Sequence, residues 1–534
     1  MSSAMILPLA LRGHAGSTPD APAIVEPGRT WTFAELDAHA DALAAGLVAA
    51  GVVPGDRVAL LAAPSASAVA LLAAAGRVGA CVAPLGTTLT TPELAAAGVV
   101  IGPRLAVHDA EHLDRARALG VPTIPLDALG AGATGARPSA NAFDPDAPAV
   151  AILTSGTTGR PKAALLSHAA MAASAAAWSA ALPAATGWVL CLGLAHVAGL
   201  GVAWRAIGAG VPLRAVPAFD PEAVLDALRQ RPASHVSLVP TQLVRLLDAV
   251  DREARGPGLA NLRAVLLGGG PIPPDLVTRA LAAGWPVVPT YGLTEAGSGV
   301  SALPTGDVAA HPGSAGRPLP GVQVRIADPA ADGTGEIQVR TPAAFFDYLG
   351  RPEATAAAFE ADGWLRTGDA GRIDADGFLH VLDRRDDLIV SGGENVFPAE
   401  VEAVLAEHPG IAEAGVAGRP DPTWGAVPVA SVVPRSGAPV PTDAELRAFC
   451  LARLASYKVP AEVIVVASLP RTASGKLRRS ELRAALAPQP PVDAKPATDG
   501  QPPVDGTLPA DSTLPAALPP ADNPPPAADT EVPA

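Results

Sequence analysis

The chain is poor in cysteine, aromatic residues and charge. Its 534 residues include 3 cysteines, 4% aromatic residues and 17% charged residues. Cys81, Cys191 and Cys450 lie far apart in the sequence, so they fit neither a disulfide framework nor a zinc site. This use of cysteine is typical of a reducing compartment, and we therefore expect a cytoplasmic protein.

Basic residues are also scarce. The chain has 38 Lys and Arg against 52 Asp and Glu, a net charge of −14, and no stretch concentrates the positive charge. A partner with a phosphate backbone needs such a concentration. The sequence therefore argues against nucleic acid binding.

Long uninterrupted apolar runs are missing as well. The opening residues, "MSSAMILPLALRGHAG", carry no basic residue before their short apolar run, which argues against a secretion signal. Residues 58–76 carry no charge, but they are rich in Ala and Ser and are interrupted by Pro64. We expect a strand at 58–62, a turn and a buried helix here, rather than a membrane span.

The chain is long, and its 49% of hydrophobic residues suffice for more than one buried core. Up to about residue 385, short apolar runs such as 148–152, 235–239 and 262–268 alternate with helical stretches. This alternation is the pattern of an α/β fold. We expect a large N-terminal domain, residues 1–385, of layered sheets flanked by helices.

The remaining residues have a different pattern. Helical stretches at 398–407 and 442–454 lie among short strand-like runs, which predicts a small α+β domain at 386–487. The last 47 residues, 488–534, include 14 prolines and no aromatic residue. We expect this Pro- and Ala-rich tail to be disordered.

The stretch "LTSGTTGRPK", residues 153–162, combines glycines, hydroxyl residues and a lysine. Strands are expected on both sides of it, and Ser167 is expected to cap the helix that follows. Backbone N–H groups freed by glycine, hydroxyls and a lysine can surround a phosphate. The loop lacks the Ser or Thr after its lysine and the directly following helix of a Walker A loop. A flexible polar turn is the alternative interpretation.

Five further motifs follow in order: "GGGP" (268–271), "YGLTE" (291–295), "GWLRTGD" (363–369), "DRRDDLIVSGGENVFPAEVE" (383–402) and "PRTASGK" (470–476). Each one alone has an ordinary interpretation. Tyr291 could be a core residue, Glu295 an exposed carboxylate at a helix start, Asp369 a turn residue and Lys476 a solvated surface lysine.

Taken together, the six motifs resemble those of the adenylate-forming acyl-CoA synthetases, the acyl-CoA ligase and luciferase superfamily. The resemblance covers roughly residues 15–487. Within that superfamily, "LLGGGPIP", "YGLTEAGS", "GSAGRPLPG" and the stretch after Leu382 most resemble the o-succinylbenzoate-CoA ligases of menaquinone biosynthesis.

The resemblance implies a two-step reaction with ATP, Mg²⁺ and coenzyme A. A carboxylate attacks the α-phosphate of ATP to give an acyl-adenylate, and a thiol then displaces AMP. Because the carboxylate is a poor nucleophile toward an anion, the protein must mainly position the reactants and neutralise charge. In the family, a mobile small domain presents a different face for each step.

The resemblance also assigns residues. Thr154, Ser155, Thr157, Thr158 and Lys162, in a loop with Gly156 and Gly159, would hold the phosphates. Gly268, Gly269, Gly270 and Tyr291 would contact the adenine, Asp369 and Arg384 the ribose, and Glu295, next to Thr294, the Mg²⁺. Lys476 would act at the α-phosphate, Asp386 would be the hinge, and Ser391, Gly392, Gly393 and Glu394 would line the CoA channel.

His196 and Arg205 are the expected substrate residues. A helix over "HVAGLGVAWRAI", residues 196–207, would place Arg205 about 13 Å along its axis from His196. Its guanidinium could hold the carboxylate of a dicarboxylic acid that does not react. Alternatively, Arg205 reaches the surface or pairs with a structural carboxylate. The family's usual Pro and Phe are Gly193 and Ala195 here, which indicates a wider acyl pocket.

Other functions stay open. The chain could activate another fatty or aryl acid, load a carrier protein in place of CoA, or bind nucleotide without catalysis. The expected partners are the carboxylic acid, ATP and CoA, and a homodimer is compatible with the sequence.

Overall fold

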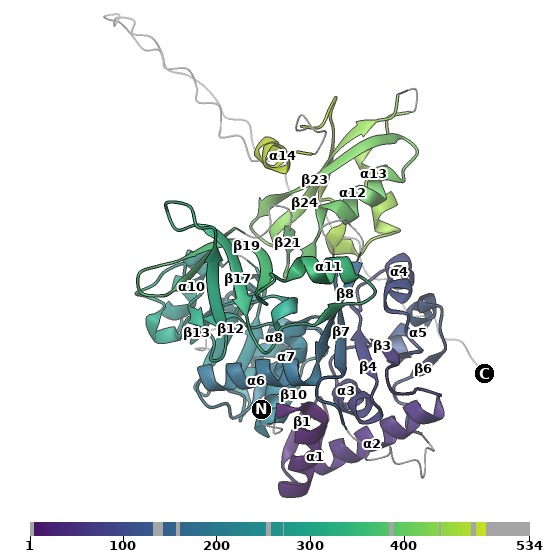
Figure 1. Ribbon diagram of the computed structural model, residues 1–534, viewed down its shortest axis with the longest axis vertical. Helices are drawn as coiled ribbons and strands as arrows, with labels where there is room; N and C mark the ends of the chain where they lie inside the picture. Colours follow the sequence, from purple (N-terminus) through teal and green to yellow (C-terminus); the bar gives the residue numbers. More distant parts are fainter. Residues whose placement is uncertain are drawn as a thin grey trace, which may run out of the picture. The chain divides into compact units, whose positions relative to one another are not determined.

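The structure is a computed structural model that describes residues 5–131, 143–155, 161–252, 258–270, 272–383, 389–436, 439–470 and 477–486. Over these residues the chain forms four β-sheets and the helices that cover them (Figure 1). Strands and helices alternate from the first residues to about residue 291. This arrangement confirms the α/β class expected from the sequence.

The first sheet has nine strands in the order β15-β14-β13-β12-β11-β9-β10-β1-β2. Its middle strands are parallel, whereas β2, β14 and β15 are antiparallel additions. The bounds are β1 Pro22–Glu26, β2 Arg29–Thr32, β9 Trp188–Leu190, β10 Leu213–Ala215, β11 His235–Leu238, β12 Ala264–Leu267, β13 Val287–Tyr291, β14 Ser301–Ala302 and β15 Arg317–Pro318.

The second sheet has seven strands in the order β18-β8-β7-β4-β3-β5-β6. Five of them are parallel, and the antiparallel pair β7–β8 contains the hairpin expected around residues 153–162. The bounds are β3 Arg57–Leu61, β4 Cys81–Pro84, β5 Leu105–His108, β6 Thr123–Pro125, β7 Pro148–Ser155, β8 Pro161–Ser167 and β18 Asp347–Tyr348.

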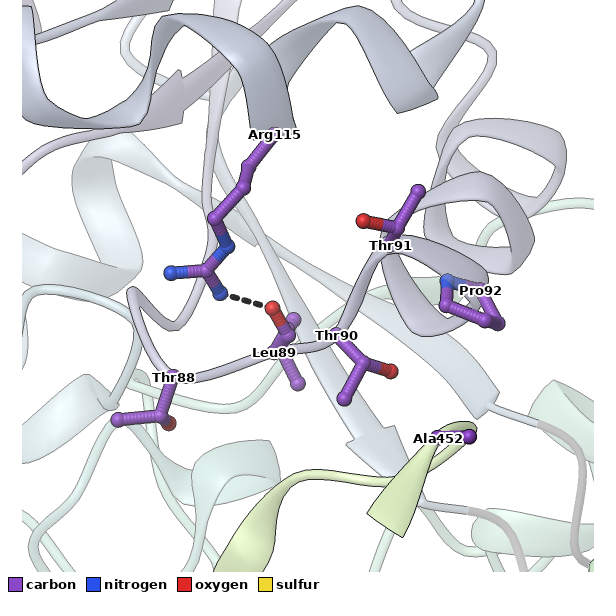
Figure 2. A pocket seen from close by; sticks show the side chains of 7 residues that line it. All are labelled: Thr88, Leu89, Thr90, Thr91, Pro92, Arg115 and Ala452. Atoms are coloured by element: carbon purple, nitrogen blue, oxygen red, sulfur yellow. Dashed lines mark hydrogen bonds between the residues drawn. The ribbon is translucent and has the colours of Figure 1, made fainter. Parts of the chain in front are cut away.

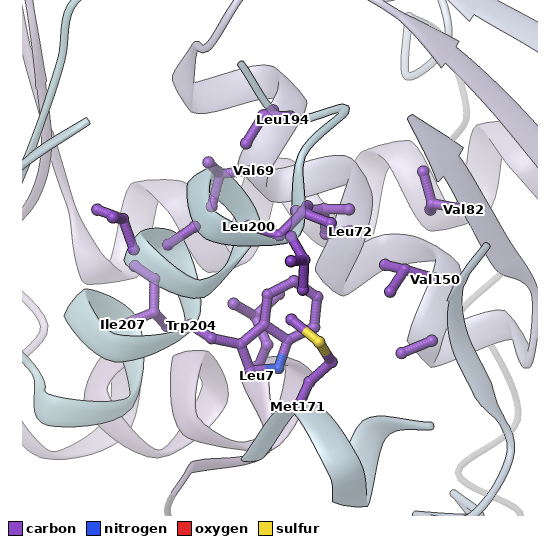
Figure 3. Close-up of a cluster of buried hydrophobic side chains, with 14 of the residues drawn as sticks. Leu7, Val69, Leu72, Val82, Val150, Met171, Leu194, Leu200, Trp204 and Ile207 are labelled. Carbon is purple, nitrogen blue, oxygen red and sulfur yellow. The ribbon is translucent and has the colours of Figure 1, made fainter. Parts of the chain in front are cut away.

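Alternate residues of these strands pack into different cores, as the pleat of a strand requires. In β9, Trp188 and Leu190 join the main core, whereas Val189 joins a second core. In β3, Val58 joins the main core, whereas Ala59 joins a third core. The main core lies between the two sheets, where Leu72, Met171 and Trp204 come together from different helices (Figure 3). The layers therefore alternate helix, sheet, helix, sheet, helix.

The helices belong to three layers. The middle layer contains α1 Leu7–Ser17, α2 Phe33–Ala49, α3 Ala66–Val78, α6 His168–Ala181 and α7 Val197–Ala209. The outer face of the first sheet is covered by α8 Pro221–Arg229, α9 Pro240–Arg252 and α10 Pro274–Ala282. The outer face of the second sheet is covered by α4 Thr91–Ile101 and α5 Leu113–Ala116.

The third sheet is an antiparallel meander that follows these layers in the chain. It has the order β16-β17-β19-β20. Its strands are β16 Gln323–Ala327, β17 Gly335–Arg340, β19 Leu365–Ile373 and β20 Leu379–Asp383, and the short helix α11 Pro352–Ala358 precedes β19.

Residues 389–486, called the C-terminal part below, have a five-stranded sheet and cores of their own. The elements are β21 Ile389–Ser391, β22 Glu394–Val396, α12 Pro398–Ala406, β23 Ile411–Asp421, β24 Gly425–Pro434, α13 Asp443–Leu451, the 3₁₀ turn η6 Ser456–Lys458, β25 Glu462–Val465 and α14 Arg479–Leu486. This part belongs to the same compact unit as the preceding residues. The expected domain boundary at Asp386 and the tail at 488–534 lie outside the described residues, so both stay predictions.

Several local expectations are confirmed. Residues 58–76 form β3, a turn and the buried helix α3, and no helix in the described residues is long and apolar enough to cross a membrane. Ser167 caps α6 by accepting a hydrogen bond from the Ala170 N–H. The three cysteines are buried free thiols, and burial raises the pKa of Cys81 and of Cys191 to about 12.

Candidate active site

A cavity of about 1550 Å³ opens at the carboxyl ends of the parallel strands of the first sheet. Val239, Gly268 and Gly292, which line it, directly follow β11, β12 and β13. Ligands of α/β proteins bind at such strand ends because the connecting loops leave a crevice there. Most of the described residues that the sequence motifs singled out line this cavity.

The hairpin β7–β8 brings Thr154 and Lys162 opposite each other across the antiparallel pair. Both residues line the cavity, and the Lys162 ammonium lies 4.9 Å from the centre of the Tyr348 ring. Ser155 pairs with Pro161 through the backbone. The loop residues Gly156, Thr157, Thr158 and Gly159 lie outside the described residues.

Glu295 reaches the same cavity from a short 3₁₀ turn, η4 Thr294–Ala296, after β13. Its Oε1 accepts a hydrogen bond of 2.6 Å from the Tyr348 hydroxyl. Tyr348 is held there because β18 pairs with β8, next to the hairpin. Tyr348 therefore contacts both the Glu295 carboxylate and the Lys162 ammonium.

Asp369 lies on β19 and is largely buried at the wall of the cavity. Its Oδ2 accepts a 2.6 Å hydrogen bond from the hydroxyl of Tyr291, and its backbone N–H donates to the Thr367 hydroxyl. Glu336 supports the same turn by accepting from the Gly368 N–H at 3.1 Å. The Asp369 carboxylate is thus held in one orientation.

Tyr291 itself is buried in the main core and is not among the described residues that line the cavity. Its contact with Asp369 makes it a support for the carboxylate. The expected stacking of its ring on adenine therefore stays a prediction.

The glycines after β12 allow close approach of neighbouring atoms. A side chain on Gly268 would lie 2.3 Å from the Thr290 hydroxyl oxygen, and Gly269 has a left-handed backbone with φ of +78°. A side chain on Gly270 would lie 3.0 Å from Val390 of the C-terminal part. Gly268 and Gly269 line the cavity, where they leave room for a flat ring.

His196 is the N-cap residue of α7, and it contacts the C-terminal part. Its Nε2 lies 3.3 Å from the carboxylate of Glu394, the first residue of β22. Burial acts against the charged imidazole, but the hydrogen bond and the charge of Glu394 outweigh it and raise the pKa of His196. Gly392 and Gly393 line the cavity beside this pair, whereas Ser391 is buried just before them.

Arg205 lies in α7, as expected, and it is one of the largest fully buried side chains. Its Nη2 donates to the Ser237 hydroxyl at 3.3 Å, and the guanidinium carbon lies 4.7 Å and 5.6 Å from the ring centres of Trp188 and Trp178. Its Nε is buried and has no hydrogen-bond partner within the described residues. Burial lowers its pKa to about 9, so it stays charged at neutral pH.

The described part of the chain supplies no carboxylate to pair with Arg205, although the guanidinium borders the cavity. Neither alternative from the sequence, a surface position or a structural ion pair, applies. Ser298 lies close by: a side chain on Gly201 would come within 3.1 Å of the Arg205 Nη1 and 3.3 Å of the Ser298 hydroxyl.

Besides the loop 156–159, three expected residues lie outside the described residues: Arg384, Asp386 and Lys476. Conversely, sequence reasoning missed Tyr348, Ser237 and the buried lysine Lys458. Tyr348 is one of only 3 tyrosines in the chain, but it reaches Glu295 only through the pairing of a two-residue strand. No local pattern announces such a contact.

A second, shallow pocket lies at the start of α4. Thr88, Thr90 and Thr91 surround it, and Ala452 faces them from the C-terminal part (Figure 2). The Arg115 guanidinium holds the loop by donating to the backbone carbonyls of Thr87 and Leu89. Because Arg115 is used to hold the loop, we interpret the pocket as a structural contact and not as a second reaction centre.

Comparison with known proteins identifies the family. Residues 11–349 match the profile "AMP-binding enzyme", and residues 400–476 match "AMP-binding enzyme C-terminal domain". A feruloyl-CoA synthase of Amycolatopsis sp. is 39% identical over 88% of this chain and 97% of its own. A 2-succinylbenzoate–CoA ligase of Geobacillus kaustophilus is 40% identical over 89% of this chain and 97% of its own.

Solved structures of o-succinylbenzoate-CoA synthetase from Bacillus subtilis are also similar. A double mutant bound with a product analogue has a TM-score of 0.83 at 35% identity, covering 89% of this chain and 98% of that one. The same enzyme in complex with ATP and magnesium has a TM-score of 0.66 at 35% identity and the same coverage. Together with the two matched profiles, these likenesses show that the chain belongs to the AMP-binding enzymes, the adenylate-forming acid–CoA ligases.

Proposed function

We propose that the chain is an o-succinylbenzoate–CoA ligase that uses ATP, Mg²⁺ and coenzyme A. In the first step an oxygen of the succinyl carboxylate bonds to the α-phosphorus, and the bond from that phosphorus to pyrophosphate breaks. In the second step the thiol sulfur of CoA bonds to the acyl carbon, the thiol loses its proton, and AMP leaves. The observation that carries the choice of acid is the buried guanidinium of Arg205.

A buried cation without a counter-charge is costly, so the site favours a ligand that brings an anion. o-Succinylbenzoate has two carboxylates, and only one of them reacts. The other can meet the planar guanidinium with two charge-assisted hydrogen bonds. The hydroxyl of Ser237, 3.3 Å from Arg205, can donate to the same anion.

Ferulate is the rival substrate, because a feruloyl-CoA synthase and a 2-succinylbenzoate–CoA ligase are about equally similar to this chain. It has one carboxylate, which must react, and its other end carries neutral hydroxyl and methoxy groups. Bound in this cavity, it would leave Arg205 buried without an anion. Arg205 therefore favours the dicarboxylic acid over an aryl acid with a neutral tail.

The other end of the cavity fits a magnesium nucleotide. Asp369 would accept from the ribose hydroxyls, and Thr154 and Lys162 would hold phosphate oxygens. No cluster of three metal-binding side chains occurs within the described residues. Mg²⁺ would thus be held by Glu295 together with phosphate oxygens, which is how this ion is commonly bound.

The remaining assignments stay as the sequence predicts them. Lys476 and Arg384 would approach the α-phosphate and the ribose, the loop 156–159 would cover the phosphates, and Asp386 would be the hinge. The turn that contains Gly392, Gly393 and Glu394 would border the path of the thiol toward His196. A cytoplasmic location and a homodimer are likewise predictions from the sequence.

Replacing Arg205 tests the acid. We expect Arg205→Leu to raise the KM for o-succinylbenzoate by roughly tenfold to a thousandfold, because one charge-assisted pair is lost. The KM for ATP should change much less. Pyrophosphate exchange at varied acid and ATP concentrations measures both constants.

A matched substrate provides the control. 4-Oxo-4-phenylbutanoate is o-succinylbenzoate without its ring carboxylate, so Arg205→Leu should bind it no worse than the parent does. The proposed acid is wrong if Arg205→Leu and the parent have the same KM for o-succinylbenzoate. It is also wrong if the parent activates ferulate but not o-succinylbenzoate.

A further inference from the structure

A buried lysine joins the C-terminal part to helix α4. The Nζ of Lys458 lies 2.6 Å from Oε1 of Glu93 and 2.8 Å from Oε1 of Glu400. The side chains of Lys458 and Glu93 are each 9% exposed, so this ion pair is largely shielded from water. Glu400 lies on α12, within the C-terminal part, whereas Glu93 lies 365 residues before Lys458.

Glu93 is held rigidly for this contact. Its other oxygen, Oε2, accepts from the backbone N–H of Thr90 at 2.7 Å and from the Thr90 hydroxyl at 2.8 Å, in the capping box of α4. The Thr90 hydroxyl also lies 2.8 Å from the carbonyl oxygen of Arg453 in the C-terminal part. The start of α4 thus offers a fixed carboxylate, next to the pocket shown in Figure 2.

The two links of Lys458 differ in kind. Its link to Glu400 is internal to the C-terminal part, where η6 and α12 pack around one core. Its link to Glu93 is external, so it exists only while the C-terminal part rests on α4. Because the pair is buried, separating it requires that both charges regain their hydration.

The neighbouring charges make this contact favourable. Burial acts against the lysine cation, but Glu400, Tyr457 and Glu93 outweigh it and raise the pKa of Lys458. Burial also raises the pKa of Glu400, whose Oε2 has no hydrogen-bond partner within the described residues. One cation therefore serves two carboxylates, and without it they would repel each other.

The structure of this chain is more similar to one ligand complex of a relative than to another. The TM-score of this chain is 0.83 with the product-analogue complex of the Bacillus subtilis enzyme and 0.66 with its ATP complex. Coverage and identity are equal in the two comparisons. This chain is therefore nearer in overall structure to the complex with the product analogue.

We propose that Lys458 is a positioning residue for the thiol step, which it serves by binding Glu93 and so holding the C-terminal part where Glu394 meets His196. This inference rests on the proposed two-step ligase reaction. It assigns Lys458 no contact with the reacting atoms. The proposed reaction uses a different face of the C-terminal part for adenylate formation, so the link should matter little for that step.

The variant Glu93→Gln tests the link. A capping box accepts Gln as well as Glu at this position, so the helix cap should survive while the charge is lost. We expect thioester formation from supplied acyl-adenylate and CoA to slow roughly tenfold, a typical size for such a coupling. Pyrophosphate exchange with the same acid should stay within about twofold of the parent.

Glu35→Gln is the matched control, because Glu35 fills the same capping-box position in α2 and forms no ion pair with a lysine or arginine of the described residues. It should leave both half-reactions unchanged. Lys458→Met should reproduce the selective loss, and adding Glu93→Gln to it should slow the thiol step little further.

Two results would overturn the role of Lys458. One is an equal loss of both half-reactions in Glu93→Gln, which would make the link merely structural. The other is an unchanged thiol step in Glu93→Gln. A parent that forms neither adenylate nor thioester with any acid would instead contradict the proposed function.

Discussion

At the scale of single residues, the pair His196–Glu394 makes the site sensitive to pH. The two side chains come from the N-cap of α7 and from the start of β22, and they lie 3.3 Å apart. Glu394 raises the pKa of His196 above its ordinary 6.5, and His196 outweighs the burial that would otherwise raise the pKa of Glu394. The pair is fully charged only between the two pKa values.

The sign of the pH effect follows from these directions. The raised pKa of His196 means that the pair contributes stability fully below pH 6.5, as long as Glu394 stays ionised, and loses it as the pH rises through the raised pKa. We expect Glu394→Gln to lower the titration midpoint of the His196 imidazole. NMR titration of protein labelled at histidine Cε1 measures it, with the signal assigned through His196→Gln. An unchanged midpoint would show that the two groups do not interact in solution.

Sequence reasoning found the charged residues of the motifs and, apart from Tyr291, missed the residues that hold them. Glu295 and Asp369 could be named because each stands in one of the motifs that follow the order found in the family. Their supports, Tyr348 and Glu336, lie on strands whose partners are set by long-range pairing. Arg205 could be named as the odd charge in an apolar helix, but its lack of a carboxylate partner is a property of the folded core.

At the scale of elements, helix α7 carries both proposed substrate residues, because His196 caps it and Arg205 lies roughly two and a half turns further on. Gly201, between them, faces the Arg205 guanidinium and Ser298. Alanine in a helix interior is favoured over glycine by about 1 kcal/mol. Here the added methyl group would lie 3.1 Å from the Arg205 Nη1, so the guanidinium would have to move.

We therefore expect Gly201→Ala to raise the KM for the acid several-fold while the KM for ATP stays unchanged. Gly13→Ala, in α1, is the control, because a side chain there meets nothing within 4 Å. It should raise the melting temperature slightly without affecting either KM. Pyrophosphate exchange and thermal melting give these values. An unchanged KM for the acid in Gly201→Ala would show that the Arg205 guanidinium accommodates the methyl group without losing its contact with the acid.

The elements themselves were largely predictable, because their signals are local. Ser167 marked the start of α6, and the polar loop between two apolar runs marked the hairpin β7–β8. The order of strands was not predictable. β1 lies beside β10, and β18 lies beside β8, and no local signal fixes such pairings. The site depends on the second of these, since β18 brings Tyr348 to Glu295.

At the scale of the whole molecule, three polar contacts within the described residues join the C-terminal part to the residues before it: His196 with Glu394, Glu93 with Lys458, and Thr90 with Arg453. Polar contacts of this kind suit an interface that forms and opens during turnover. The sequence predicted the two parts and named both residues of one contact, His196 and Glu394, but it did not predict that they meet. The charges that complete it, Glu93 and Lys458, look like ordinary surface residues in the sequence.

Replacing Lys476 tests the other half-reaction, adenylate formation. It lies outside the described residues, and the family resemblance assigns it to adenylate formation alone. Removing a group that stabilises developing charge typically costs a hundredfold to a thousandfold in rate. We expect Lys476→Ala to lose pyrophosphate exchange to about this extent, while thioester formation from supplied acyl-adenylate stays within about twofold of the parent. Glu93→Gln should show the reverse pattern, so each variant is the other's control for folding. If Lys476→Ala slows both half-reactions equally, the two steps share one arrangement of the chain, and the division of labour between Lys476 and the Lys458 link is wrong.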